Sequence, residues 1–119
     1  MEREKILVTG VAGFIGSAIA NKLLELGYEV YGIDDLSSGE KSKIPKEVNF
    51  IEADLSNVSS LAKLPSNVKY IMHLSGQSSG EISFDDPILD LQKNTHSTLN
   101  LISYMIKNDY ISAAENFEY

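Results

Sequence analysis

The chain has 119 residues, with 17 Asp or Glu and 10 Lys or Arg, so its formal net charge is −7. Hydrophobic residues make up 43% and charged residues 23%, a composition typical of one globular domain. An acidic chain with scattered basic residues is poorly suited to a phosphate backbone, so we expect no nucleic-acid partner. The absence of Cys excludes disulfides, thiolate metal sites and a cysteine nucleophile.

Neither a signal peptide nor a membrane span is visible. Near the amino terminus only residues 6–8 are continuously apolar, and no stretch approaches the roughly 20 apolar residues that cross a bilayer. We expect a cytoplasmic protein without a membrane partner.

The first third of the chain predicts a strand, a helix and a second strand. Residues 5–9 and 28–33 are short apolar, β-branched runs, as in buried strands. Between them, apolar residues recur at about one helical turn until Gly27, a natural helix stop. These residues are Ile15, Ile19, Leu23 and Leu26.

Shorter elements follow. Residues 37–43 read as a polar loop whose lysines are solvated, and residues 48–51 as a third strand. Ser56 is expected to cap a short helix that Pro65 ends. Residues 68–74 predict a fourth strand.

A long helix is expected after this strand. Asp86 supplies a cap and Pro87 the first helical position of a helix to Lys107. Residues 108–119 form an atypical acidic tail. The alternation of strands and helices predicts an α/β fold, a doubly wound parallel sheet of Rossmann type. We expect an incomplete sheet of about four strands in the order 3-2-1-4, with a crevice between the first and fourth.

A glycine-rich loop joins the first strand to the first helix, with the spacing G-x-x-G-x-x-G. Gly10 permits a sharp turn, Gly13 a close approach to a pyrophosphate, and Gly16 close helix packing. The N–H groups of the first helical turn then face the phosphates. The loop predicts a dinucleotide site. The alternative is that the glycines serve only turns and packing.

Asp34 ends the second strand, close to the expected position for a ribose-binding acid, about 20 residues after the glycine loop. A carboxylate there accepts hydrogen bonds from the ribose hydroxyls and repels a 2′-phosphate, which favours NAD over NADP. The glycine spacing disfavours an FAD-binding half.

Five motifs in this order resemble the NAD-dependent epimerase/dehydratase family of the extended short-chain dehydrogenase/reductase superfamily. The resemblance is to the amino-terminal part of nucleotide-sugar enzymes of the UDP-glucose 4-epimerase type. The motifs are Thr9 to Gly16, Asp34 to Gly39, Asp54 with Leu55, His73 to Gln77, and Asp86 to Leu101. The resemblance implies an NAD-binding domain over residues 1–107.

The resemblance also implies individual roles. The glycine loop would cradle the pyrophosphate, the acids after the second strand would hold the adenosine ribose, and Asp54 would accept from the adenine amino group. Residues after the fourth strand would line the cofactor, and Asn94 would order the loops over it. The implied NAD-binding residues are Gly10, Gly13, Phe14, Ile15, Gly16, Asp34, Asp35, Ser38, Asp54, Leu55, Leu74, Ser75, Gly76, Gln77 and Asn94.

Several of these residues have a simpler alternative. Leu74 suits a core position, while Asp54 and Asn94 suit caps or loop bonds. His73, at the end of an apolar strand, is expected to be packed and hydrogen-bonded, and His96 solvated. We expect no metal site.

The family's catalytic Tyr-x-x-x-Lys does not occur in the sequence, so no catalytic residue is assigned. A fifth strand and a substrate lobe are also not recognisable. We therefore expect the NAD-binding portion of an epimerase/dehydratase, inactive alone, that would meet a nucleotide sugar only in a full-length form. The alternative is a stand-alone, non-catalytic NAD-binding or regulatory module.

The fourth strand is expected to have an apolar unpaired edge, formed by Val68, Tyr70, Ile71 and Met72. A homodimer, a partner chain or residues 108–119 would cover it.

Overall fold

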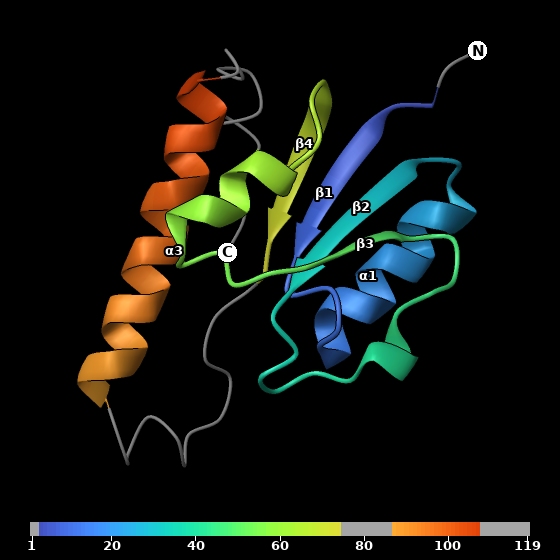
Figure 1. Cartoon of the computed structure of the whole chain (residues 1–119). Helices are drawn as coiled ribbons and strands as arrows, with labels where there is room; N and C mark the ends of the chain where they lie inside the picture. The colour runs from blue at the N-terminus through green and yellow to red at the C-terminus, as the bar shows by residue number, and fades with distance from the viewer. Residues whose placement is uncertain (1–2, 75–86, 108–119) are drawn as a thin grey trace.

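In the computed structural model, which describes residues 3–74 and 87–107, one parallel sheet carries helices on both faces (Figure 1). The strand order is β3-β2-β1-β4, which confirms the predicted order and fold class. In chain order the elements are β1 (Lys5–Thr9), α1 (Phe14–Glu25), β2 (Glu29–Asp34), the 3₁₀ helix η1 (Lys41–Lys43), β3 (Asn49–Glu52), the 3₁₀ helix η2 (Val58–Lys63), β4 (Val68–His73) and α3 (Pro87–Lys107).

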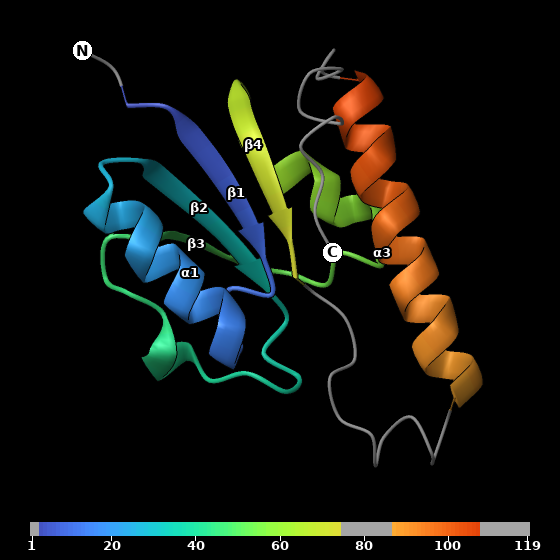
Figure 2. The ribbon, with the colours of Figure 1, turned by 180° about the vertical axis from the view of Figure 1, so that it is seen from behind.

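The central strand β1 places alternate side chains in two separate cores. Leu7 packs in the core that includes Leu101 of α3, whereas Ile6 and Val8 pack in the core that includes Ala20 of α1. Figure 2 shows the same arrangement from behind, with α1 on one face of the sheet and α3 on the other. Burial on both faces explains why β1 is continuously apolar rather than alternating.

Helix α1 differs in one respect from the predicted apolar stripe. Ile15 and Leu26 are each 62% exposed, and the buried residues of the helix are Gly16 and Ala20. The helix begins so close to the glycine loop that a Cβ on Gly16 would lie 2.0 Å from the Gly10 carbonyl oxygen. Small residues therefore face the sheet at the start of the helix, and Ile15 is exposed there. Leu26 follows the last residue of the helix.

The end of α1 is as predicted. Gly27 has a left-handed φ of 93°, and its N–H donates to the Leu24 carbonyl at 3.0 Å. The Tyr28 N–H donates to the Leu23 carbonyl at 3.1 Å. This pair of bonds satisfies carbonyls that the last helical turn leaves open.

The prediction that Ser56 caps a short helix is wrong. Asn57 caps η2 by accepting from the Ser59 N–H, and η2 is a 3₁₀ helix. The Ser56 hydroxyl and N–H instead both donate to the Asp54 carboxylate, at 2.6 and 2.9 Å. The Ser56 hydroxyl thus bonds within the preceding turn and does not cap η2.

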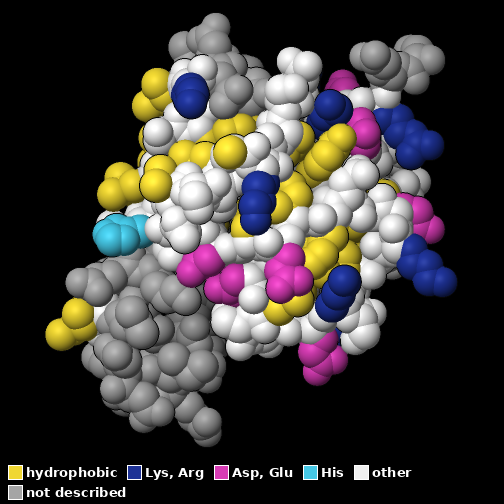
Figure 3. Space-filling model, in the orientation of Figure 1, with side chains coloured by type: hydrophobic (Ala, Val, Ile, Leu, Met, Phe, Trp, Pro, Cys, Tyr) yellow, Lys and Arg dark blue, Asp and Glu magenta, His cyan; other side chains and the backbone are white. Residues whose placement is uncertain are grey.

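The outer face of α3 carries apolar side chains. Leu99, Ile102 and Ile106 are exposed, and hydrophobic side chains gather along this side of the molecule in Figure 3. His96 is also exposed, as predicted. Among the described residues, no helix combines the length and hydropathy that a membrane crossing requires.

Two leucines on α3 allow a matched test of its docking. Leu101 is 0% exposed and Leu99 is 56% exposed. Leu101→Ala should lower the free energy of unfolding by about 2–4 kcal/mol, because it leaves a cavity between α3 and the sheet. Leu99→Ala should change it by less than about 0.5 kcal/mol. Urea unfolding followed by circular dichroism measures both, and equal losses would contradict the observed docking.

Candidate dinucleotide-binding site

The glycine loop leaves β1 at the carboxyl edge of the sheet. Gly10 has a φ of 72°, a left-handed conformation that favours glycine. Its N–H donates to the Ile33 carbonyl at the end of β2, at 2.9 Å, and its own carbonyl accepts from the Gly13 N–H at 3.1 Å. The chain thus turns sharply across the end of β2 before α1 begins.

Gly13 and Gly16 serve different purposes in this loop. Gly13, the residue before α1, has a φ of −79°, which any residue adopts, and its added Cβ would meet only the Gly10 carbonyl oxygen, at 3.3 Å. Gly16 tolerates no Cβ because the Gly10 backbone blocks it. Gly16 is therefore required for packing. The fold does not require a glycine at position 13 in this way. A glycine there therefore fits the close approach of a ligand to the backbone.

The beginning of α1 suits an anion. No side chain caps the helix at Gly13, and the first turn carries no acidic residue. The side chains of Phe14 and Ile15 are 82% and 62% exposed, so they do not cover the sheet. The first-turn N–H groups and the helix dipole together favour a phosphate at this position.

Asp34 holds the glycine loop in place. One carboxylate oxygen accepts from the Ala12 N–H at 2.9 Å, and the other accepts from the Leu36 N–H at 2.8 Å. Its backbone carbonyl accepts from the Ala53 N–H at 3.1 Å. Sequence analysis predicted a ribose ligand and missed this second role. Because two carboxylate oxygens offer about four acceptor positions, ribose hydroxyls remain compatible with both bonds.

The loop after β2 folds back against the glycine loop. The Glu40 N–H donates to the Ala12 carbonyl at 3.2 Å, and an added Cβ on Gly39 would lie 2.6 Å from the same oxygen. Asp35 accepts from the Ser37 N–H at 3.0 Å, and Ser38 is exposed. Their predicted contacts with the ribose stay a prediction.

The residues after β3 have clear structural roles. Asp54 accepts from Ser56, the loop-bonding alternative considered above. Leu55 is 5% exposed and belongs to the α3-side core, while its carbonyl accepts from the Asn100 side chain at 2.9 Å. Their predicted contacts with adenine stay a prediction.

Leu74 is described, whereas four other predicted residues are described only in part or not at all. Leu74 is half-buried against the α1-side core. Ser75, Gly76 and Gln77 lie outside the described residues, and Asn94 lies on α3 with its side chain outside the described part.

His73 links three elements at the end of β4. Its Nδ1 lies 2.7 Å from the Thr9 hydroxyl of β1, and its Nε2 lies 3.2 Å from the Thr98 hydroxyl of α3. This confirms the packed, hydrogen-bonded histidine that the sequence predicted. Burial lowers the pKa of His73 from its ordinary value of 6.5, so the imidazole is neutral at pH 7. The sequence analysis assigned no hydrogen bond to Thr9. Its position directly before Gly10 is the one sequence feature that indicated a role at the glycine loop.

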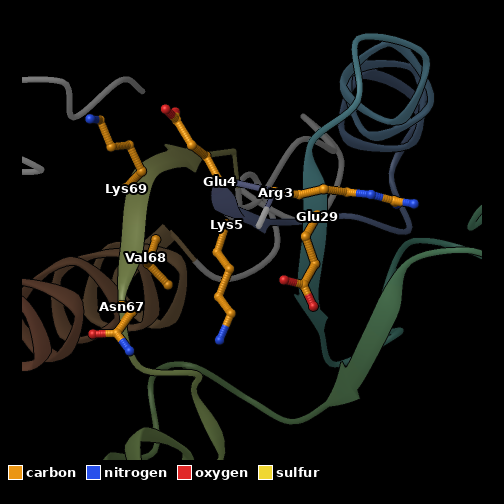
Figure 4. Close-up of a pocket in the computed structure, with 7 residues that line it drawn as sticks. All are labelled: Arg3, Glu4, Lys5, Glu29, Asn67, Val68 and Lys69. Atoms are coloured by element: carbon orange, nitrogen blue, oxygen red, sulfur yellow. The ribbon is translucent and has the colours of Figure 1, made fainter. Parts of the chain in front are cut away.

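A hollow lies at the opposite, amino-terminal edge of the sheet (Figure 4). The side chains of Arg3 and Lys69 point away from each other there, and Glu4 and Glu29 add negative charge. These mixed charges, with the two basic side chains pointing apart, do not form a binding site for an anion. Within the described ranges, no group of three or more His, Asp or Glu is placed to hold a metal ion.

The strand order, the glycine loop at the switch between β1 and β4, and the acid at the end of β2 define a dinucleotide-binding domain of Rossmann type. A family model described as "NAD dependent epimerase/dehydratase family" matches residues 6–115, and the chain belongs to this family.

Individual proteins are similar to most of this chain. A UDP-glucose 4-epimerase from Mycolicibacterium smegmatis is 38% identical over 103 residues, which cover 82% of this chain and 33% of that protein. A Thermotoga maritima UDP-glucose 4-epimerase, crystallised with UDP-glucose, has a TM-score of 0.83 at 36% identity, covering 87% of this chain and 34% of that one. The Bordetella bronchiseptica enzyme WbmF, in complex with NAD⁺, has a TM-score of 0.79 at 35% identity, with coverages of 87% and 32%. The chain thus spans about a third of these relatives.

The buried His73 predicts how stability depends on pH. Its folded-state pKa is lowered, so the unfolded chain takes up the proton first as the pH falls. The stability due to the neutral imidazole is fully present above about pH 6.5 and is lost as the pH falls through the folded-state pKa. Urea unfolding between about pH 8 and pH 5 measures this loss. It should persist in His96→Gln and be absent in His73→Gln; the same pH dependence in both variants would refute the assignment.

Proposed function

We propose that this chain is the NAD-binding portion of a nucleotide-sugar epimerase/dehydratase of the UDP-glucose 4-epimerase type. The observation that carries the proposal is the contact between Asp34 and the glycine loop. The Asp34 carboxylate bonds to the Ala12 N–H at 2.9 Å, so the ribose-binding acid and the phosphate-binding loop form one unit. A dinucleotide has its ribose and pyrophosphate adjacent in the same way.

The residues present fit NAD. Gly13 allows a close approach at the start of α1, where the uncapped N–H groups would bind the pyrophosphate. Asp34 would accept from the adenosine ribose hydroxyls, with Asp35 and Ser38 beside it. Lys41 and Lys43 are exposed on η1, and the loop that precedes η1 packs on the glycine loop through Glu40. The carboxylate at Asp34 would disfavour a 2′-phosphate, so NAD is proposed over NADP.

The reaction itself needs residues that this sequence does not contain. When bound, the nicotinamide supplies hydride transfer in this family. The 119 residues include no Tyr-x-x-x-Lys, the pair that would move the hydroxyl proton. We therefore propose that the chain alone binds NAD without converting a nucleotide sugar, which it would meet only as part of a full-length form. The stand-alone regulatory module and the cytoplasmic location stay predictions.

Binding of NAD⁺ can be tested by calorimetry with NADP⁺ as the competing cofactor. We expect saturable binding of NAD⁺ and markedly weaker binding of NADP⁺. Gly13→Ala should weaken NAD⁺ binding about 10- to 100-fold, equivalent to losing one charge-assisted hydrogen bond, because its methyl group would keep the phosphates away.

Gly27→Asn is the matched control. It changes a glycine at the far end of α1, in the left-handed conformation that Asn tolerates, with no atom within 4 Å of the added Cβ. NAD⁺ affinity should be unchanged in this variant. A folded chain that binds neither cofactor would refute the proposed function.

We also propose that β4 pairs with a second copy of the chain or with a partner chain. β4 is the end strand of the described sheet, and its Val68 and Ile71 are buried while Tyr70 and Met72 are half-buried. Residues 108–119, the other predicted cover, lie outside the described residues.

Sedimentation velocity tests this pairing. We expect a dimer that Met72→Lys converts to a monomer, because a charge on an edge strand opposes pairing. The exposed Lys69→Glu on the same strand controls for a change of charge alone. A wild-type chain that sediments as a monomer, with β4 amides exchanging rapidly with solvent, would contradict the proposal.

A further inference from the structure

We propose that His73 is a positioning residue for dinucleotide binding, which fixes the carboxyl ends of β1 and β4 by accepting a hydrogen bond from Thr9. The inference rests on the proposed function for its ligand, but its structural part stands on geometry alone. Thr9 and His73 are register partners in the pairing of β1 with β4. Their side chains are 0% and 3% exposed, so water does not compete for the bond.

The hydroxyl of Thr9 is the centre of the arrangement. It accepts from the Leu74 N–H at 2.9 Å, and the same N–H also lies 3.2 Å from the Thr9 carbonyl oxygen. The residue after Thr9 is Gly10, which begins the glycine loop, and Leu74 is the first residue beyond β4. One hydroxyl therefore connects the two backbone segments that leave β1 and β4 at the carboxyl edge of the sheet.

The two contacts of His73 fit the tautomer that carries its hydrogen on Nε2. The contact of 2.7 Å between Thr9 Oγ1 and Nδ1 matches an O–H donor, which forms shorter bonds than N–H. The contact of 3.2 Å between Nε2 and Thr98 Oγ1 suits an N–H donor. In the proposed tautomer Thr9 donates to Nδ1, and the hydrogen on Nε2 is donated to Thr98 of α3.

Protonation would reverse the bond at Thr9. A proton on Nδ1 turns this atom into a donor, so the Thr9 oxygen would have to accept from both His73 and Leu74 while its own hydrogen turns away. The ends of β1 and β4 would then shift relative to each other, and the glycine loop would shift with β1. A less well-formed loop binds NAD⁺ more weakly because ordering it costs part of the binding free energy.

Burial is the one cause of the lowered His73 pKa. The described parts of the elements packed on it carry few titratable groups, and none of these contributes to the shift. They are Lys5 on β1, Lys69 and Tyr70 on β4, and His96, Tyr104 and Lys107 on α3. A change in NAD⁺ binding that follows the protonation of His73 can therefore be assigned by comparison with His96, the second histidine of the chain.

The test combines nuclear magnetic resonance with NAD⁺ titration of the 119-residue chain. Imidazole ¹⁵N shifts give the tautomer and pKa of His73, while the amide shifts of Gly10 and Leu74 report the two strand ends. NAD⁺ affinity is measured by calorimetry across the same pH range. Thr9→Val removes the donor with little change of shape, Thr98→Val removes the contact with α3, and His96→Gln is the matched control.

We expect the Nε2–H tautomer, amide shifts of Gly10 and Leu74 that follow the His73 titration, and NAD⁺ binding that weakens about three- to tenfold on protonation, the value of one hydrogen bond. Thr9→Val should weaken binding similarly at pH 8 and remove the pH dependence, and His96→Gln should match the wild type.

Two results would overturn the inference while leaving the proposed function intact. The first is that the amide shifts of Gly10 and Leu74 do not change as His73 is protonated. The second is that the NAD⁺ affinity does not change over the same pH range. The wild-type titration requires no variant to fold. Absence of NAD⁺ binding at every pH would instead overturn the proposed function, and the ligand role of His73 with it.

Discussion

The bond between the Asp34 carboxylate and the Ala12 N–H is the contact on which the arrangement of the glycine loop and the loop after β2 depends. It ties the end of β2 to the glycine loop, and the second carboxylate oxygen fixes the next loop through the Leu36 N–H. Leu36 has a left-handed φ of 63°, unusual for a branched side chain, and this bond holds it there. One side chain thus shapes both loops that would surround an adenosine, so a change at Asp34 would alter the form of the site as well as its charge.

The glycine loop is also held from its other side. Thr9, directly before it, contacts His73 on β4, while Glu40 bonds to the Ala12 carbonyl from the loop after β2. Three neighbouring segments therefore hold a loop whose own residues are mostly small. These bonds from neighbouring segments restrict the conformational freedom that the glycines would otherwise keep.

The strand order and most element types could be predicted, because they follow from apolar runs and from glycines whose spacing has few other uses. The contact of Asp34 with the glycine loop at one edge of the sheet agrees with the predicted position of the candidate site. The helix over Pro87–Lys107 has the predicted bounds. The features that could not be predicted depend on contacts between residues that the fold brings together. The exposure of Ile15 follows from the close approach of Gly16 to Gly10, and the cap at Asn57 follows from the Ser56 hydroxyl being bound to Asp54. Neither contact can be found from residue spacing alone, and the backbone role of Asp34 is hidden for the same reason.

The position of β1 in the sheet has a consequence for how the chain folds during synthesis. Contacts between the glycine loop and the end of β2 join positions 22 apart, whereas the pairing of Thr9 with His73 joins positions 64 apart. The longer loop costs only about 1 kcal/mol more to close, but it cannot close before β4 has left the ribosome. Until then β1 has a neighbour on one side only, and its apolar residues face water where Ile71 and Leu101 will later pack. The nascent half-sheet is therefore the stage at which this chain is most exposed to aggregation.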